Sequence, residues 1–317
     1  SDVYKRQGFA MKVLILGIGG LGGFFGAHLQ KTNCDVTFLV RENTKKLVSE
    51  RGIKIQSDFG NFKINPVLIT KKDLKINYDV VMISCKAYDL DEAITDLKPS
   101  QKNAVIIPLL NGQAHINKLE KAFKKENVFG GVAHVSSNTK SPGEIKHVGK
   151  IKRLSIGSRH QTNQDIANEF YQLCRKADFQ TVLSDNIDQD IWEKWIFIAT
   201  IAGATTLFQT SIDNISKKPN GKTFIQNLWN ECINISKENG YELRAESKNL
   251  HEDLLFKSDV PFKASMLIDM EKKLMTEHEH IFFEFIKLGK KKKLNTSLLE
   301  TCHLNMCIYE DNLSQEG

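Results

Sequence analysis

The feature that most constrains this 317-residue chain is a glycine-rich segment between a short apolar run and a helical pattern. Residues 12–16 have the sequence KVLIL, typical of a buried strand, and Gly17-Ile18-Gly19-Gly20-Leu21-Gly22 follows directly. In the pattern G-x-G-x-x-G, the glycines permit a tight turn, a close backbone approach to a pyrophosphate, and close helix–strand packing. The first turn of the helix presents N–H groups to the phosphates. The sequence therefore predicts a dinucleotide site at Gly17, Gly19, Gly20, Leu21 and Gly22.

The following segments alternate between strand and helix patterns. Residues 36–40, 79–85 and 104–109 are apolar and rich in β-branched side chains, with helical segments between them. This alternation predicts a parallel sheet covered on both faces. Residues 128–157 have a β-rich pattern with a turn at Pro142-Gly143.

From about residue 185 onward the apolar spacing is almost wholly helical. We therefore predict an α/β protein with a Rossmann-type N-terminal domain over residues 11–182 and an all-α domain over residues 183–317. Residues 1–10, which precede the first strand and Met11, are treated as an extension of unknown origin.

Composition excludes several other classes of protein. The net charge of +6 is spread along the chain, so the sequence predicts no nucleic-acid partner. Six cysteines form no C-x-x-C pair, which predicts neither a disulfide framework nor a zinc site. The chain has no run of 18 apolar residues and no signal-peptide core near its start, so we expect a cytoplasmic protein without membrane contact.

The residue that ends the second strand pattern indicates which dinucleotide is bound. NAD enzymes usually place an acidic residue there, whereas this chain has Arg41, whose guanidinium can bind the 2′-phosphate of NADP. The adjacent Glu42 would reverse this preference if the register shifted by one residue. We therefore predict NADP (NADPH) as cofactor, with Arg41 as a binding residue.

Several segments, taken in order, resemble the ketopantoate reductase (2-dehydropantoate 2-reductase) family over most of the chain. VMISCKAYDL resembles the family's strand-end lysine segment and contains Lys86, and PLLNG resembles its N-G signature and contains Asn111. SPGEIKHVG resembles its hairpin motif, and IWEKW resembles its W-x-K helix and contains Lys194. SMLIDM, followed by Thr276-Glu277, resembles the helix that carries its substrate-binding Ser265 and Glu277.

The resemblance implies reduction of 2-dehydropantoate to pantoate by NADPH, a step of pantothenate and coenzyme A biosynthesis. It implies that Lys194 is the proton donor and that Glu277 is a second catalytic residue. Lys86 and Asn111 would contact cofactor and substrate, while Ser265, Lys194 and Glu277 would bind substrate. The expected active site lies in a cleft between the carboxyl edge of the sheet and the helical domain.

The position of Lys194 is consistent with this role on physical grounds. Residues 194, 198 and 202 share one stripe of a helix, and the stripe is otherwise apolar (Ile198 and Ala202). A lysine at the head of such a stripe is partly desolvated, which lowers its pKa toward the range useful for acid catalysis. The alternative is a lysine whose stem packs on the core while its ammonium group reaches water.

Three positions depart from the family pattern, which places asparagines where this chain has Ile198, Ala202 and Ile212. The short stretch after the glutamate, usually small and glycine-containing, is here His280-Ile281-Phe282-Phe283. Without these polar contacts, the sequence predicts a more apolar substrate pocket. Because hydrogen-bond partners set specificity strongly, such a pocket should discriminate between substrates differently. An NADPH reductase of another 2-oxo acid is therefore an alternative. A non-catalytic NADP-binding sensor or interaction protein is a second one.

Two E-x-x-H pairs, Glu277/His280 and Glu144/His147, have the i, i+3 spacing found in di-metal carboxylate helices. A di-metal helix site needs both pairs on helices, and the second pair falls in the predicted hairpin. The sequence therefore predicts no metal. The expected partner is a small 2-oxo acid. The sequence is compatible with a homodimer but does not determine the oligomeric state.

Overall fold

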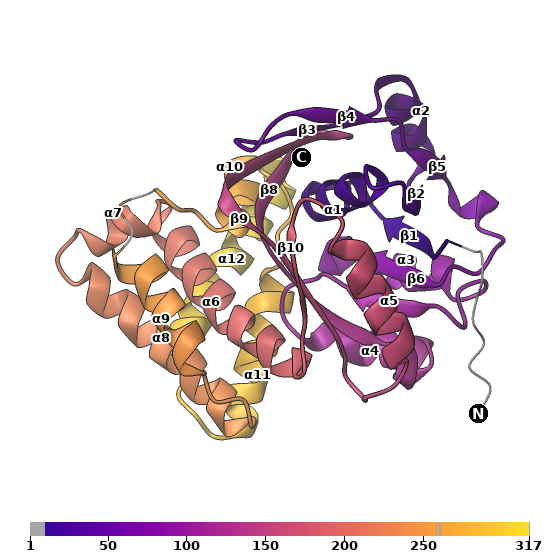
Figure 1. Ribbon diagram of the computed structural model, residues 1–317. Helices are drawn as coiled ribbons and strands as arrows, with labels where there is room; N and C mark the ends of the chain where they lie inside the picture. Colours follow the sequence, from indigo (N-terminus) through magenta and orange to yellow (C-terminus); the bar gives the residue numbers. More distant parts are fainter. Residues whose placement is uncertain (1–9, 258, 260, 317) are drawn as a thin grey trace. The chain divides into compact units, whose positions relative to one another are not determined.

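The computed structural model describes residues 10–257, 259 and 261–316. The predicted extension over residues 1–10 therefore lies, except for Ala10, outside the described residues. The chain forms two compact units. Figure 1 shows the chain coloured along its sequence. Unit 1 runs up to Leu110 and from His115 to Asp188, and unit 2 contains Asn111–Ala114 and the chain from Gln189 onward. The predicted domain boundary at residues 182/183 stays a prediction.

Unit 1 contains a five-stranded parallel sheet, which confirms the predicted Rossmann-type fold class. Its strand order is β5-β2-β1-β6-β7, and all four pairings are parallel. The strands are β1 (Lys12–Leu16), β2 (Asp35–Leu39), β5 (Val67–Ile69), β6 (Val80–Ile83) and β7 (Val105–Pro108). Every residue of β6 and β7 is buried, as expected for the centre of a sheet covered on both faces.

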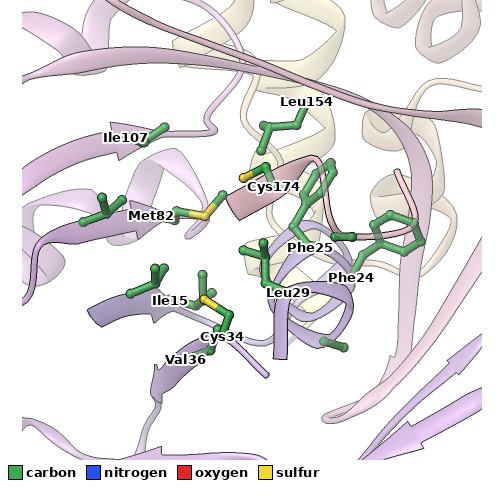
Figure 2. Packing of buried hydrophobic residues seen from close by; sticks show 14 of the residues in the cluster. Ile15, Phe24, Phe25, Leu29, Cys34, Val36, Met82, Ile107, Leu154 and Cys174 are labelled. Carbon is green, nitrogen blue, oxygen red and sulfur yellow. The ribbon is translucent and has the colours of Figure 1, made fainter. Parts of the chain in front are cut away.

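The helices of this unit alternate with the strands. They are α1 (Gly20–Gln30), α2 (Glu42–Arg51), α3 (Leu90–Leu97), α4 (Ala114–Ala122) and α5 (Gln164–Cys174). Figure 2 shows α1 side chains such as Phe25 and Leu29 packed beside Ile15 and Met82 of the sheet. Cys34 belongs to the same core, and burial raises the pKa of its thiol to about 12. This thiol therefore behaves as a small apolar side chain.

A second sheet in unit 1 has the order β10-β9-β3-β4, with β8 also paired to β9. Its strands are β3 (Ile53–Gln56), β4 (Phe62–Ile64), β8 (Phe129–Ser141), β9 (Glu144–Ser158) and β10 (Gln180–Leu183). The predicted hairpin is confirmed, because β8 and β9 are antiparallel and Gly143 takes a φ of +83° at the turn. The sequence did not predict β3 and β4, which are only four and three residues long.

Among its described residues, unit 2 contains helices joined by irregular segments and no strand, as predicted. Its long central helix is α6 (Ile187–Phe208), which begins in unit 1. The others are α7 (Ile212–Ser216), α8 (Gly221–Glu238), α9 (Ala245–Glu252), α10 (Ser265–Glu271), α11 (Glu284–Lys291) and α12 (Ser297–Glu316), with π-helical turns η4 (Asp253–Lys257) and η5 (Glu279–Phe283). Within the described residues, no helix is both long and apolar enough to cross a membrane.

Candidate functional site

The glycine loop of unit 1 joins β1 to α1, and its three motif glycines meet different surroundings. Gly17 takes a φ of +91°, a conformation that favours glycine at the turn. A Cβ on Gly22 would clash with Ser84 Oγ and with the Gly17 carbonyl oxygen. A Cβ on Gly19 would meet no atom within 4 Å among the described residues. Gly22 is therefore required by the fold itself, whereas the space beside Gly19 is open to a phosphate.

Gly20 and Leu21 begin α1 and lie against the second sheet. A Cβ on Gly20 would come within 2.5 Å of the Ser137 carbonyl oxygen, and Ser137 Oγ donates a hydrogen bond to the Gly20 carbonyl at 2.8 Å. Leu21 packs on the core of unit 1. Among the described residues, no side chain caps α1 at Gly19. The loop therefore fits a pyrophosphate, with backbone N–H groups as its donors.

Arg41 lies two residues after β2 and directly precedes α2. Its side chain is 70% exposed and pairs with Asp89 at 3.3 Å and Glu92 at 3.2 Å. These two carboxylates raise the pKa of the Arg41 guanidinium. The neighbouring Glu42 instead pairs with Lys72 at 3.3 Å. A 2′-phosphate would therefore compete with two carboxylates for Arg41.

Lys86 directly precedes the 3-10 turn η2 (Ala87–Asp89), three residues after the carboxyl end of β6. Its side chain is partly buried. Ligands of open α/β sheets bind beyond this edge, and the contact of Lys86 with cofactor and substrate stays a prediction.

Four of the predicted site residues come together within unit 2, namely Asn111, Lys194, Ser265 and Glu277. A recess is lined by Asn111, Ser265 and Glu277. Ile198 and Ala202 of α6 line it as well, together with Ala264, Met266, Asp269 and Ile281. The side-chain oxygen of Asn111 is buried with no hydrogen-bond partner among the described residues. Such an atom is costly unless a ligand or water satisfies it, which indicates a binding site.

Lys194 lies one helical turn before Ile198 on α6 and is the fourth of these residues, although it is not part of the lining. Burial lowers the pKa of its ammonium group to about 8, and the negative charge of Glu277 opposes this shift. The carboxylate therefore favours the protonated form of this desolvated lysine. An amine with this pKa can both donate and recover a proton near neutral pH.

The neighbours of Lys194 on α6 explain how the helix is fixed. Glu193 is buried, accepts a hydrogen bond from Arg244 Nε at 2.8 Å, and accepts another from Ser247 Oγ at 2.5 Å. These bonds outweigh burial and lower the pKa of the Glu193 carboxyl. On another side of α6, Trp195 Nε1 donates to the Ile281 carbonyl at 3.0 Å. The segment that follows Glu277 is therefore tied to α6.

The structure corrects the prediction that one helix carries both Ser265 and Glu277. The helix α10 ends at Glu271, and Lys273 takes the left-handed φ of +55°. The Leu274 N–H donates back to the Asp269 carbonyl, a bond that closes the helix end. Glu277 lies in the irregular segment before η5 and reaches the recess from there.

The sequence missed Asp269, which also lines the recess. It lies four residues after Ser265 on α10, and this i, i+4 spacing was the signal that could have found it. Conversely, Ile212 is buried at the start of α7 and does not line the recess. Its departure from the family pattern therefore does not alter this wall, whereas Ile198 and Ala202 do make the wall apolar.

Unit 1 thus combines a Rossmann-type parallel sheet with open space beside Gly19, and unit 2 combines a recess with a desolvated lysine. Two family models, Ketopantoate reductase PanE/ApbA and its C-terminal counterpart, match residues 13–161 and 186–305. The chain belongs to this family of oxidoreductases.

Individual relatives agree with this assignment. The chain is 34% identical to the uncharacterized oxidoreductase YkpB of Bacillus subtilis (strain 168), over 95% of this chain and 99% of that protein. It is 24% identical to a 2-dehydropantoate 2-reductase of Streptococcus pyogenes serotype M18, over 90% and 94% of the two chains. The solved structure of D-mandelate dehydrogenase with NADH and anilino(oxo)acetate shares the fold, with a TM-score of 0.86, 18% identity, and coverage of 96% and 100%.

Proposed function

We propose that this chain uses NADPH to reduce the ketone of a 2-oxo acid, with 2-dehydropantoate as the first substrate to test. The observation that carries the proposal is the desolvated Lys194 beside Glu277, next to a recess lined by Asn111 and Ser265. A protein that only binds a nucleotide has no need of a lysine whose pKa is lowered to about 8. The matched family supports the same activity.

The cofactor would be held by residues of unit 1 and by Asn111. The backbone of Gly17, Gly19, Gly20, Leu21 and Gly22 would bind the pyrophosphate, Arg41 the 2′-phosphate, and Lys86 and Asn111 the nicotinamide end. The open space beside Gly19 and the unpaired oxygen of Asn111 support this assignment. When bound, a reduced nicotinamide supplies the hydride that the ketone carbon accepts.

Side chains of unit 2, together with Lys86, would complete the reaction. Lys194 Nζ donates a proton to the ketone oxygen as negative charge develops there, and Glu277 keeps that proton on the lysine beforehand. Asn111 and Ser265 offer hydrogen bonds that orient the substrate, and Lys86 offers a positive charge for its carboxylate. The product is a 2-hydroxy acid, and Lys194 regains its proton from water.

A second candidate is reduction of a 2-oxo acid with a more apolar side chain than that of 2-dehydropantoate. Ile198 and Ala202 form an apolar wall of the recess, which offers no hydrogen bond to a substrate hydroxyl. The same fold occurs in 2-dehydropantoate 2-reductases and in a D-mandelate dehydrogenase. With 2-dehydropantoate as substrate, the enzyme would act in pantothenate and coenzyme A biosynthesis.

The decisive experiment follows the oxidation of NADPH with 2-dehydropantoate and with a panel of 2-oxo acids bearing alkyl or aryl side chains. We expect turnover with at least one member of the panel, and kcat/KM ranks the two candidates. Tight NADPH binding without turnover on any member would contradict the enzyme proposal and favour a sensor. A parallel series with NADH tests the proposed cofactor preference.

A further inference from the structure

A compact group of metal-ligating side chains lies in unit 2, outside the recess described above. It contains His278 and Glu279 at the start of η5, and His303 and Cys307 one turn apart on α12. One ligand atom from each residue lies within 4.8 Å of the other three. Helical periodicity explains the α12 pair, because residues i and i+4 share one face.

The distances within this group are close to those of a tetrahedral zinc site. Cys307 Sγ lies 3.9 Å from His278 Nε2 and 3.6 Å from His303 Nε2. Glu279 Oε1 lies 3.3 Å from His278 Nε2 and 2.6 Å from His303 Nε2. Zinc bonds of about 2.0–2.3 Å at tetrahedral angles separate ligand atoms by roughly 3.3–3.6 Å. Small side-chain adjustments would therefore suffice.

The second nitrogen of His278 is already held in the manner of a metal ligand. Its Nδ1 lies 3.0 Å from Thr276 Oγ1 and 3.4 Å from Glu310 Oε1. The Thr276 N–H in turn donates to Glu310 at 3.2 Å. Hydrogen bonds of this kind fix the imidazole so that the opposite nitrogen faces the metal. The His303 ring stacks on Phe283, with ring centroids 5.4 Å apart, which limits its rotation.

The charges and donor types of the group also favour a divalent ion. When a bound metal displaces the proton of the Cys307 thiol, this thiolate and the Glu279 carboxylate carry two negative charges. A doubly charged cation neutralises them, and the two imidazoles add no charge. Sulfur and imidazole nitrogen are ligands that zinc prefers over magnesium or calcium. Four protein ligands leave no open position, which is the arrangement of structural rather than catalytic zinc sites.

We propose that His278, Glu279, His303 and Cys307 form a structural Zn²⁺ site that fastens the start of η5 to α12. The site departs from the sequence-based expectation of no metal, which concerned the pairs Glu277/His280 and Glu144/His147. It is independent of the proposed reductase activity. Because Glu277 directly precedes His278, a bound ion would also hold the chain that presents this carboxylate to the recess.

The test uses the full-length protein, stripped with a chelator and then titrated with Zn²⁺ alone or with Co²⁺ as a spectroscopic probe. We expect one equivalent of tightly bound Zn²⁺ by elemental analysis and a thiolate-to-cobalt charge-transfer band with Co²⁺. We also expect the Tm to rise by roughly 5 °C in zinc at a hundredfold excess over Kd.

Two variants and one control separate this site from adventitious binding. Cys307→Ala should remove the charge-transfer band and the stoichiometric zinc, and Glu279→Gln, at an exposed position, should weaken zinc binding at least tenfold. Cys85→Ser, at another partly buried cysteine, should change neither. Absence of zinc binding to the wild type, or equal binding by all four proteins, would overturn the proposal.

Discussion

The glycine loop of unit 1 and the recess of unit 2 are built in opposite ways. The loop places six consecutive residues, 17–22, and its chemistry comes from backbone geometry that a single Cβ would disturb. The recess collects side chains from Asn111, from α6, from α10 and from the segment around Glu277. Local sequence thus specifies the geometry of the glycine loop, whereas the packing of helices brings the side chains of the recess together.

The largest expected effect tests whether unit 2 alone carries the chemistry. Lys194→Met keeps most of the side-chain volume but removes the proton donor, so we expect kcat to fall by about 10²–10⁴-fold. NADPH affinity, measured by fluorescence titration, should remain within a fewfold of wild type. Lys248→Met, at an exposed lysine of α9, is the matched control. Unchanged turnover in Lys194→Met would remove the proton-donor role.

The second effect tests the glycine loop with two substitutions of equal size. Gly22→Ala inserts a methyl group against Ser84 and the Gly17 carbonyl, so we expect a loss of about 2 kcal/mol in the free energy of unfolding. Gly19→Ala meets open space, so its Tm should stay near that of the wild type. Its NADPH affinity should nevertheless fall about tenfold or more. Equal NADPH affinity in Gly19→Ala and wild type would show that no phosphate approaches this position.

The third effect asks whether a side chain in unit 1 selects the cofactor. Arg41→Ala should weaken NADPH binding by about 30-fold, the equivalent of roughly 2 kcal/mol for charge-assisted hydrogen bonds, and leave NADH binding unchanged. The double variant Asp89→Asn/Glu92→Gln should tighten NADPH binding, because it removes the carboxylates that compete for Arg41. Arg51→Ala, at the end of α2, is the control. Parallel losses for both cofactors would rule out a 2′-phosphate contact.

The fourth effect concerns the pH dependence of the recess. The pKa of Lys194 is lowered to about 8, so the protonated donor dominates below pH 8 and is lost above it. We expect kcat for reduction to be level near pH 7 and to fall by about tenfold per pH unit well above pH 8. Glu277→Gln removes the charge that raises this pKa, so the break in the profile should move to lower pH. A profile that is flat to pH 10 would contradict the assignment.

The smallest expected effect concerns the apolar wall. Ile198→Asn adds an amide at the recess and should raise kcat/KM for hydroxylated 2-oxo acids severalfold relative to alkyl ones, since one hydrogen bond contributes about 1 kcal/mol. Ile212→Asn should leave this relative preference unchanged, because Ile212 does not line the recess. A relative preference that does not change in Ile198→Asn would mean that this wall does not contact the substrate side chain.

The parts of the fold that follow from local pattern were predictable. The strands β1, β2, β6 and β7, the long helix α6 and the hairpin turn at Gly143 all rest on short-range periodicity or turn chemistry. The pairing of β3 with β9 was not predictable, because a short strand carries little periodic signal and this partner is far away in the sequence. The strand β4, which pairs with β3, is only three residues long and carries even less signal. The helix expected through Glu277 failed for a related reason, since its end depends on the conformation of Lys273.

By itself, the sequence determined the glycine loop and the fold class. Each of these depends on neighbours within a few residues. Only the tertiary structure decided that Glu277 sets the charge on Lys194, that Asp269 joins the recess, and that Arg41 is engaged by Asp89 and Glu92. It also gathered His278, Glu279, His303 and Cys307 into one group. Electrostatic and coordination chemistry depend on distance in space, which sequence spacing does not give across separate helices.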